Sequence, residues 1–169
     1  MERMNTIRGS ALFGKRVLSS IILLAVCATP LWATEIAVIV HKDNPLEDIS
    51  FDNLRKICRA EKQFWDGGEK IYLLLRESGN QEKTIMLKTV YQMEEMGLKK
   101  FWLTKLFREE IPSFPNALGS NEAVKRFVAQ VPNAIGFIDG QYVDDTVKVL
   151  TIDGKSFQSP GYPLTDQSQ

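Results

Sequence analysis

Short apolar runs alternate with stretches of helical periodicity, and this alternation constrains the fold more than any other feature of the sequence. The first run, Ile36–Val40, is unbroken, which is typical of a strand buried on both faces, as in a parallel sheet. Runs at 71–75, 134–138 and 147–150 predict three more strands. Strands that alternate with helices indicate an α/β domain whose sheet is covered on both faces. In such domains, ligands bind beyond the carboxyl ends of the strands.

Four segments between these runs have the periodicity of amphipathic helices. They cover 51–58, about 81–96, a following stretch with Leu98, Trp102 and Leu106 on one side, and a last one that carries Val124 to Val131. Ser50 and Ser120 precede the first and the last of them as N-cap residues. In the helix predicted at 81–96, one face is expected to pack against the core, and Gly97 is expected to end the helix. That face carries Ile85, Met86, Val90, Met93 and Met96.

Residues 1–33 have the composition of a secretory signal peptide. Basic residues precede an uncharged run from Val17 to Val26, and a small residue, Ala33, offers a cleavage position. The run is shorter than the roughly 20 residues that span a bilayer. Cleavage after Ala33 is therefore predicted, with an uncleaved anchor or a lipid on Cys27 as alternatives. The remaining chain divides into a domain at 34–154 and a polar C-terminal tail at 155–169.

The composition excludes several classes of site. The 169 residues include one His and two Cys, too few for a site with two imidazoles or four thiolates. Without the leader, acidic residues exceed basic ones by three, and no Lys/Arg block predicts a nucleic-acid partner. No paired carboxylates or nucleophile motif indicate an enzyme, and no cofactor or metal is expected. Cys58 is interpreted as a small buried hydrophobe.

The loop after the strand at 71–75 is the candidate ligand site. Arg76 ends the strand, and Glu77-Ser78-Gly79-Asn80 leads into the next helix, whose free N–H groups would point at the same place. The predicted ligand-binding residues are Arg76, Ser78, Gly79, Asn80, Gln81 and Lys83. Two alternatives need no ligand. Ser78 and Gln81 have the spacing of a capping box, and a salt bridge to Glu77 or Glu82 would account for Arg76.

The sequence resembles the phosphate-binding subunit of bacterial phosphate ABC transporters, which is a periplasmic binding protein. The matching segments occur in the family's order: 38–45, 51–58, 65–68, 76–80, 131–137, 152–154 and 162–164. The resemblance implies a three-layer sandwich with a mixed, mostly parallel sheet, like one lobe of a type II periplasmic binding protein. The family has two lobes with a ligand cleft between them, whereas these segments all belong to one lobe. The resemblance also implies a location in the periplasm.

The family's phosphate loop resembles Arg-x-x-Gly-Ser-Gly-Thr, and this chain departs from it. Alignment on Arg76 and Gly79 places Glu82 at the Thr position, while alignment on Ser78-Gly79 shortens the loop by two residues. In the first register, a carboxylate and an incoming anion about 4 Å apart repel by roughly 4 kcal/mol at an effective dielectric constant of 20. Attraction to a helix N-terminus of about 0.3–1 kcal/mol cannot offset this. Loss of Glu82 should then strengthen anion binding, and Arg76→Ala should abolish it.

Two functions follow from the resemblance. In the first, the chain is a solute-binding-protein-like module that binds phosphate or another small oxyanion weakly, between millimolar and tens of micromolar. In the second, the exposed cleft face of a single lobe meets a protein partner or another copy of the chain, with no small-molecule ligand. Neither function involves a nucleic acid, nor a membrane after signal cleavage.

Overall fold

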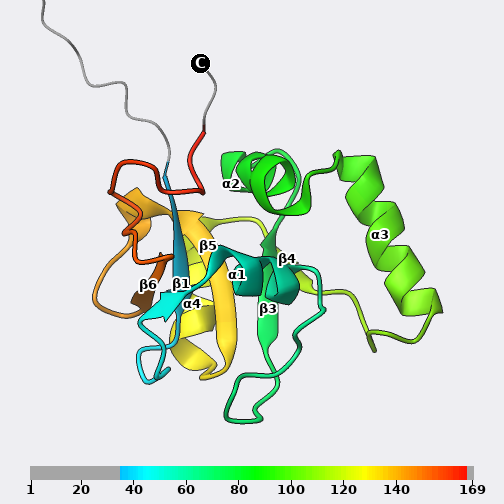
Figure 1. The fold of residues 1–169 in the computed structure, drawn as a ribbon, viewed down its shortest axis with the longest axis horizontal. Coiled ribbons are helices and arrows are strands. Elements are labelled where there is room, and N and C mark those ends of the chain that lie inside the picture. The colour runs from blue at the N-terminus through cyan, green and yellow to red at the C-terminus, as the bar shows by residue number, and fades with distance from the viewer. Residues whose placement is uncertain (1–34, 167–169) are drawn as a thin grey trace, which may run out of the picture. The chain divides into compact units, whose positions relative to one another are not determined.

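The computed structural model describes residues 35–166, which contain one six-stranded mixed sheet (Figure 1). The strand order is β2-β6-β1-β5-β3-β4. The strands are β1 (Ile36–Val40), β2 (Asp48–Ile49), β3 (Tyr72–Arg76), β4 (Asn116–Leu118), β5 (Ala134–Asp139) and β6 (Lys148–Ile152). Three neighbouring pairs are parallel, and β1 runs antiparallel to both β5 and β6. The predicted α/β fold with a mixed, mostly parallel sheet is confirmed.

Helices cover both faces of the sheet. They are α1 (Phe51–Cys58), α2 (Gln81–Met86) with a π-helical continuation at Leu87–Tyr91, α3 (Glu95–Phe107) and α4 (Asn121–Gln130), and a 3-10 turn follows at Gly140–Tyr142. The predicted caps of the first and last helices are confirmed. The Ser50 hydroxyl accepts from the Asn53 N–H at 3.2 Å, and the Ser120 hydroxyl accepts from the Ala123 N–H at 3.1 Å.

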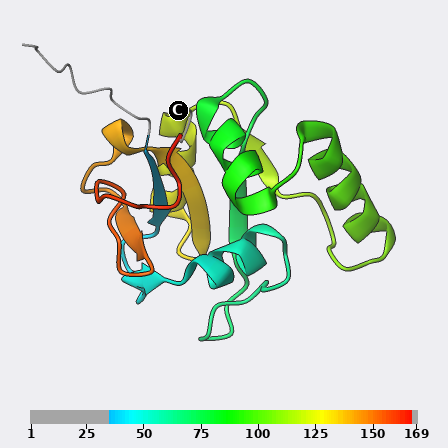
Figure 2. The ribbon, with the colours of Figure 1, turned by 45° about the horizontal axis from the view of Figure 1, so that its top comes forward.

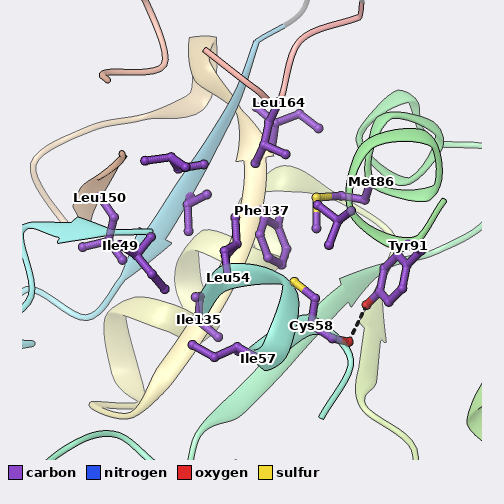
Figure 3. Close-up of a cluster of buried hydrophobic side chains, with 14 of the residues drawn as sticks. Ile49, Leu54, Ile57, Cys58, Met86, Tyr91, Ile135, Phe137, Leu150 and Leu164 are labelled. Atoms are coloured by element: carbon purple, nitrogen blue, oxygen red, sulfur yellow. Dashed lines mark hydrogen bonds between the residues drawn. The ribbon is translucent and has the colours of Figure 1, made fainter. Parts of the chain in front are cut away.

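Two apolar cores lie on opposite faces of the sheet because successive side chains of a strand point to opposite sides. Along β1, Ile36, Val38 and Val40 join the core under α1 and α2, whereas Ala37 and Ile39 join the core under α4. Figure 3 shows the first core. There the Tyr91 hydroxyl donates to the Cys58 carbonyl oxygen at 2.9 Å. The Cys58 side chain is buried as predicted, and burial raises the pKa of its thiol.

β1 is not parallel to its neighbours in the sheet, although its apolar run is typical of a parallel strand. The strand is buried on both faces, as predicted, but it runs antiparallel to both neighbours. Burial on both faces requires helices on both sides of the sheet and does not require parallel neighbours. An unbroken apolar run therefore predicts the burial of a strand and leaves its direction open.

The helix predicted at 81–96 is wrong beyond Tyr91. Gln92 adopts a left-handed conformation with φ of 53°, and a new helix, α3, begins at Glu95. The turn changes the direction of the chain, so the helical phase does not continue across it. The side chains of Ile85, Met86 and Val90 are buried as predicted, and that of Met93 is half-buried. Met96 is 74% exposed, and Gly97 lies in the first turn of α3 and does not end a helix.

The prediction of a polar C-terminal tail is wrong for residues 155–166. Tyr162 and Leu164 are buried in the core. The Ile36 N–H donates to the Leu164 carbonyl oxygen at 3.0 Å, and the Tyr162 hydroxyl donates to the Ile36 carbonyl oxygen at 2.8 Å. Half-buried Phe157 also packs against the core. These three apolar side chains anchor an otherwise polar segment beside β1.

The predicted signal peptide, its cleavage site and the Cys27 alternative lie outside the described residues. Between residues 35 and 166, no helix is both long and apolar enough to cross a membrane.

Candidate functional site

The Arg76 side chain lies inside the domain at the end of β3. It is 3% exposed. Its guanidinium donates to the Leu118 carbonyl oxygen at 3.0 Å and to Asn80 Oδ1 at 3.1 Å. A Glu82 carboxylate oxygen lies 3.6 Å from Arg76 Nη2, and the Glu82 side chain is 6% exposed. The alternative that a salt bridge accounts for Arg76 is confirmed, with Glu82 as the partner. A role for Arg76 in contacting a ligand stays a prediction.

The position of Glu82 contradicts the expectation that its carboxylate faces an incoming anion. The carboxylate lies in the interior beside a guanidinium. A carboxylate at this depth loses its hydration and needs a cationic partner. Glu82 therefore neutralises Arg76 and holds the start of α2 against the end of β3.

A second group of charges joins the loop to α3. The Ser78 hydroxyl donates to Glu95 Oε1 in a short hydrogen bond, and Lys83 Nζ donates to the same oxygen at 3.2 Å. Lys83 Nζ also lies 3.3 Å from Ser78 Oγ. The hydrogen bond from Ser78, followed by that from Lys83, lowers the pKa of Glu95 below its usual value. The side chains of Ser78 and Lys83 thus converge on one carboxylate.

The remaining candidate residues shape the turn. Gly79 has φ of +87°, a conformation that favours glycine. Asn80 is the N-cap residue of α2, and its amide nitrogen donates to the Glu77 carbonyl oxygen at 3.0 Å. Gln81 lies to one side, with its amide nitrogen 3.3 Å from a carboxylate oxygen of Asp166. The capping-box interpretation of Ser78 and Gln81 is wrong, because α2 begins two residues too late for Ser78 to be its N-cap.

The comparisons with known proteins agree with the resemblance. No protein-family model matches the chain. The phosphate-binding protein PstS of Bacillus subtilis strain 168 is 28% identical over 134 residues, which cover 76% of this chain and 41% of PstS. A putative phosphate ABC transporter substrate-binding protein from Clostridium perfringens, solved with bound phosphate, has a TM-score of 0.60 at 26% identity and covers 73% of this chain and 47% of that protein. The chain is similar, over about three quarters of its length, to phosphate ABC transporter substrate-binding proteins.

The fold of the chain also matches that of an ABC-type phosphate transport receptor from Vibrio cholerae. The TM-score is 0.63 at 17% identity, over 79% of this chain and 54% of the receptor. At that identity the likeness shows the fold alone. The chain spans about half the length, or less, of the relatives that it matches.

The loop brings two hydrogen-bond donors to one point. A hydroxyl donor and an ammonium group meet at one carboxylate oxygen, and a carboxylate is itself an oxyanion. The cavity beside Arg76 and Lys83 has a volume of only about 20 Å³ and is lined mainly by apolar side chains, so a ligand would have to bind at the surface. Within residues 35–166, no cluster of three or more His, Cys, Asp or Glu side chains could hold a metal ion.

Glu95 is the residue of this group that sequence analysis missed. It lies 17 residues from Ser78 in the chain, and no local pattern connects them. An acidic residue in the first turn of a helix is a known sequence signal, and Glu95 has this position in α3. However, the sequence predicts one helix over 81–96, which places Glu95 at the end of a helix.

Proposed function

We propose that this chain is an exported solute-binding-protein-like module that weakly binds phosphate or another small oxyanion at the loop Arg76–Lys83. The observation that carries the proposal is the convergence of Ser78 and Lys83 on the Glu95 carboxylate. That carboxylate occupies a position in which an external oxyanion would have the same two donors. The similarity to proteins named for phosphate binding supports this assignment.

In the proposed binding event, the oxyanion displaces Glu95 from Ser78 and Lys83. Glu95 is 38% exposed, and water screens ion pairs at exposed positions, so that they contribute little. Displacement of Glu95 would therefore reduce the affinity for the oxyanion by about fivefold at most. Gly79 and Gln81 complete the proposed contact set. Arg76 and Asn80 belong to it chiefly through the loop that they hold in place.

Calorimetric titration of the exported, processed chain with phosphate tests the proposal at low and moderate salt. We expect a dissociation constant between millimolar and tens of micromolar. Glu95→Gln should tighten binding by up to about fivefold, and Lys83→Met should abolish it. Glu110→Gln is the matched control, because Glu110 also accepts from a lysine, Lys105, at 2.7 Å. Sulfate and molybdate titrations define the class of anion.

A protein-interaction module with no small-molecule ligand is the second candidate. It is favoured by the internal neutralisation of the loop, in which Arg76 has Glu82 and Lys83 has Glu95 as partners. Such a loop needs no external anion. If neither the wild-type chain nor Glu95→Gln binds any of the three anions, the oxyanion proposal is wrong and this alternative takes its place.

The proposed location of the protein in the periplasm depends on the predicted signal peptide at residues 1–33. We propose that residues 1–33 are removed during export and that the domain acts in the periplasm as a binding protein, with no catalytic role. Intact mass of exported material should show a chain that starts near Thr34. A full-length mass, or a lipid on Cys27, would contradict this assignment.

A further inference from the structure

Helix α3 carries apolar side chains on two opposite faces. Leu98 and Trp102 are buried against the domain. On the other face, Met96 is 74% exposed, Leu103 is also exposed and Phe107 is 82% exposed. Figures 1 and 2 show that α3 stands beside the sheet, so that only one of its sides meets the rest of the domain. The domain does not use the second apolar face to fold.

The exposed side chains form a stripe along the helix, which we call the outer stripe. Its members are Met96, Lys100, Leu103 and Phe107, at the four-three-four spacing that keeps residues on one side of a helix. The stripe extends over about 16 Å at the helical rise per residue. Monomeric proteins seldom leave large apolar side chains aligned in this way unless the surface binds something.

The charges around the outer stripe select the kind of partner. The side chains of Lys99 and Lys100 are exposed, and within residues 35–166 neither ammonium group makes a hydrogen bond or close ion pair, although Lys99 is near enough to Glu95 to help lower the pKa of that carboxyl. The acidic residue in the first turn of α3, Glu95, is turned towards Ser78 and Lys83. Along its length, the accessible side of the helix therefore carries the ammonium groups of Lys99 and Lys100, and exposed acidic residues stand only at the helix ends, at Glu94 and Glu109. Together with the apolar side chains, this favours a partner that is both apolar and anionic.

A second copy of the chain fits this pattern poorly. If two outer stripes packed together, the Lys100 side chains of both copies would enter the apolar seam between the helices. A charged residue in such a seam reduces the stability of the pair. The adjacent Lys99 side chains would add like-charge repulsion.

We propose that the outer stripe docks on an anionic lipid surface, with α3 lying in the plane of the headgroups. Met96, Leu103 and Phe107 would enter the headgroup boundary, as the apolar face of an interfacial helix does. The long stems of Lys100, within the stripe, and of Lys99, beside it, allow their ammonium groups to extend to lipid phosphates. The protruding Phe107 suits a deformable bilayer, whereas a protein partner would have to provide a matching groove.

Docking of this kind is weak and reversible, because three apolar side chains bury little area. Exposed Glu94 and Glu109 at the ends of α3 reduce the net attraction, so added salt should weaken binding further. The sequence predicts no membrane contact after signal cleavage, because its periodicity places Met96 on the core face of a helix at 81–96 and leaves no outer face for α3.

Vesicle flotation with the exported, processed chain tests the proposal, after intact mass has shown that the apolar leader is absent. Vesicles of phosphatidylcholine alone are compared with vesicles that contain about one-third phosphatidylglycerol. We expect binding to the anionic vesicles only, with a decrease at high salt. Phe107→Ser should reduce the partition coefficient about tenfold or more, given the transfer free energy of a Phe side chain. A double Lys99→Glu, Lys100→Glu change should abolish binding.

Phe64→Ser is the matched control, because Phe64 is a half-exposed Phe that lies outside α3. It should bind vesicles as the wild type does. Equal binding to both kinds of vesicle, or wild-type binding by Phe107→Ser, would overturn the proposal. So would a mass that doubles with concentration and depends on Phe107, which would indicate a second copy, or stripe-dependent binding of an acidic protein with no affinity for vesicles. Phosphate titration of Phe107→Ser should give the dissociation constant of the wild type, because Phe107 is not part of the proposed oxyanion site. A loss of vesicle binding in this variant would therefore not depend on phosphate binding.

Discussion

Replacement of Glu82 by Leu should destabilise the domain by about 3 kcal/mol. The substitution leaves the Arg76 guanidinium without a carboxylate at a position where its side chain is 3% exposed. Loss of one partner from a buried pair costs about 3–5 kcal/mol. The lower end applies here, because the pair is 3.6 Å apart and Arg76 keeps its hydrogen bonds to the Leu118 carbonyl oxygen and to Asn80.

The melting temperature should fall by about 10 °C, since a domain of this size changes by roughly 2–8 °C per kcal/mol. Circular dichroism during heating and during urea denaturation measures the change in stability. The slope of the unfolding free energy against urea concentration should stay the same as in the wild type. Asp66→Leu is the control. It breaks the exposed Lys62–Asp66 pair, which is 2.6 Å apart, and should cost less than about 1 kcal/mol.

The double variant Arg76→Met, Glu82→Leu should recover most of the lost stability, because a buried ion pair can often be replaced by apolar side chains without loss. A melting temperature of Glu82→Leu within about 2 °C of the wild type would refute the reasoning. Tighter phosphate binding by a fully stable Glu82→Leu would do the same. It would show that Glu82 faces the ligand, as the sequence alone suggested.

Three further predictions concern other parts of the domain. Gly136→Ala should lower the free energy of unfolding in urea by about 1–3 kcal/mol, because its new Cβ would lie 2.6 Å from Val124 Cγ1; an unchanged free energy would mean that α4 can move away from β5 at little cost. Val90→Asp should abolish cooperative unfolding measured by near-ultraviolet circular dichroism, because Val90 is fully buried; a wild-type melting curve would place Val90 at the surface. A hydrogen bond from Lys125 is the main cause that lowers the pKa of Asp144 to about 2. The stabilisation from Asp144 is thus present above about pH 4 and lost as the pH falls through 2, and an NMR titration should show Lys125→Met raising this pKa.

Helical and strand periodicity predicted most elements, because burial of one face repeats at a fixed spacing. The prediction failed at Gln92, where a non-glycine residue adopts a left-handed conformation without a Gly or Pro to signal it. It failed again at Tyr162 and Leu164, because two apolar residues are too few to define a period. The order of the strands in the sheet could not be predicted from local patterns, because the neighbours of β1 come from distant segments of the chain.

For the candidate site, the sequence located the loop and the two possible partners of Arg76. Which of Glu77 and Glu82 pairs with Arg76 depends on where α2 begins, because the start of this helix at Gln81 turns the Glu82 side chain inward and leaves Glu77 in the loop before it. Glu95 could not be connected with Ser78, because their contact depends on the turn at Gln92 that brings α3 back to the loop.

The position of β1 has a consequence for the order in which the domain can fold. Among the described strands β1 is made first, yet its neighbours β5 and β6 lie about 100 residues later in the chain, and the carbonyl oxygen that receives the Ile36 N–H belongs to Leu164. Contacts between residues so far apart must close a long loop before they stabilise anything, which slows folding. A nascent chain that has emerged only as far as α4 therefore holds an apolar strand without either neighbour. Completion of the sheet around β1 must wait for the segment that contains β5 and β6, so a chaperone that binds exposed apolar strands has a long interval in which to bind β1.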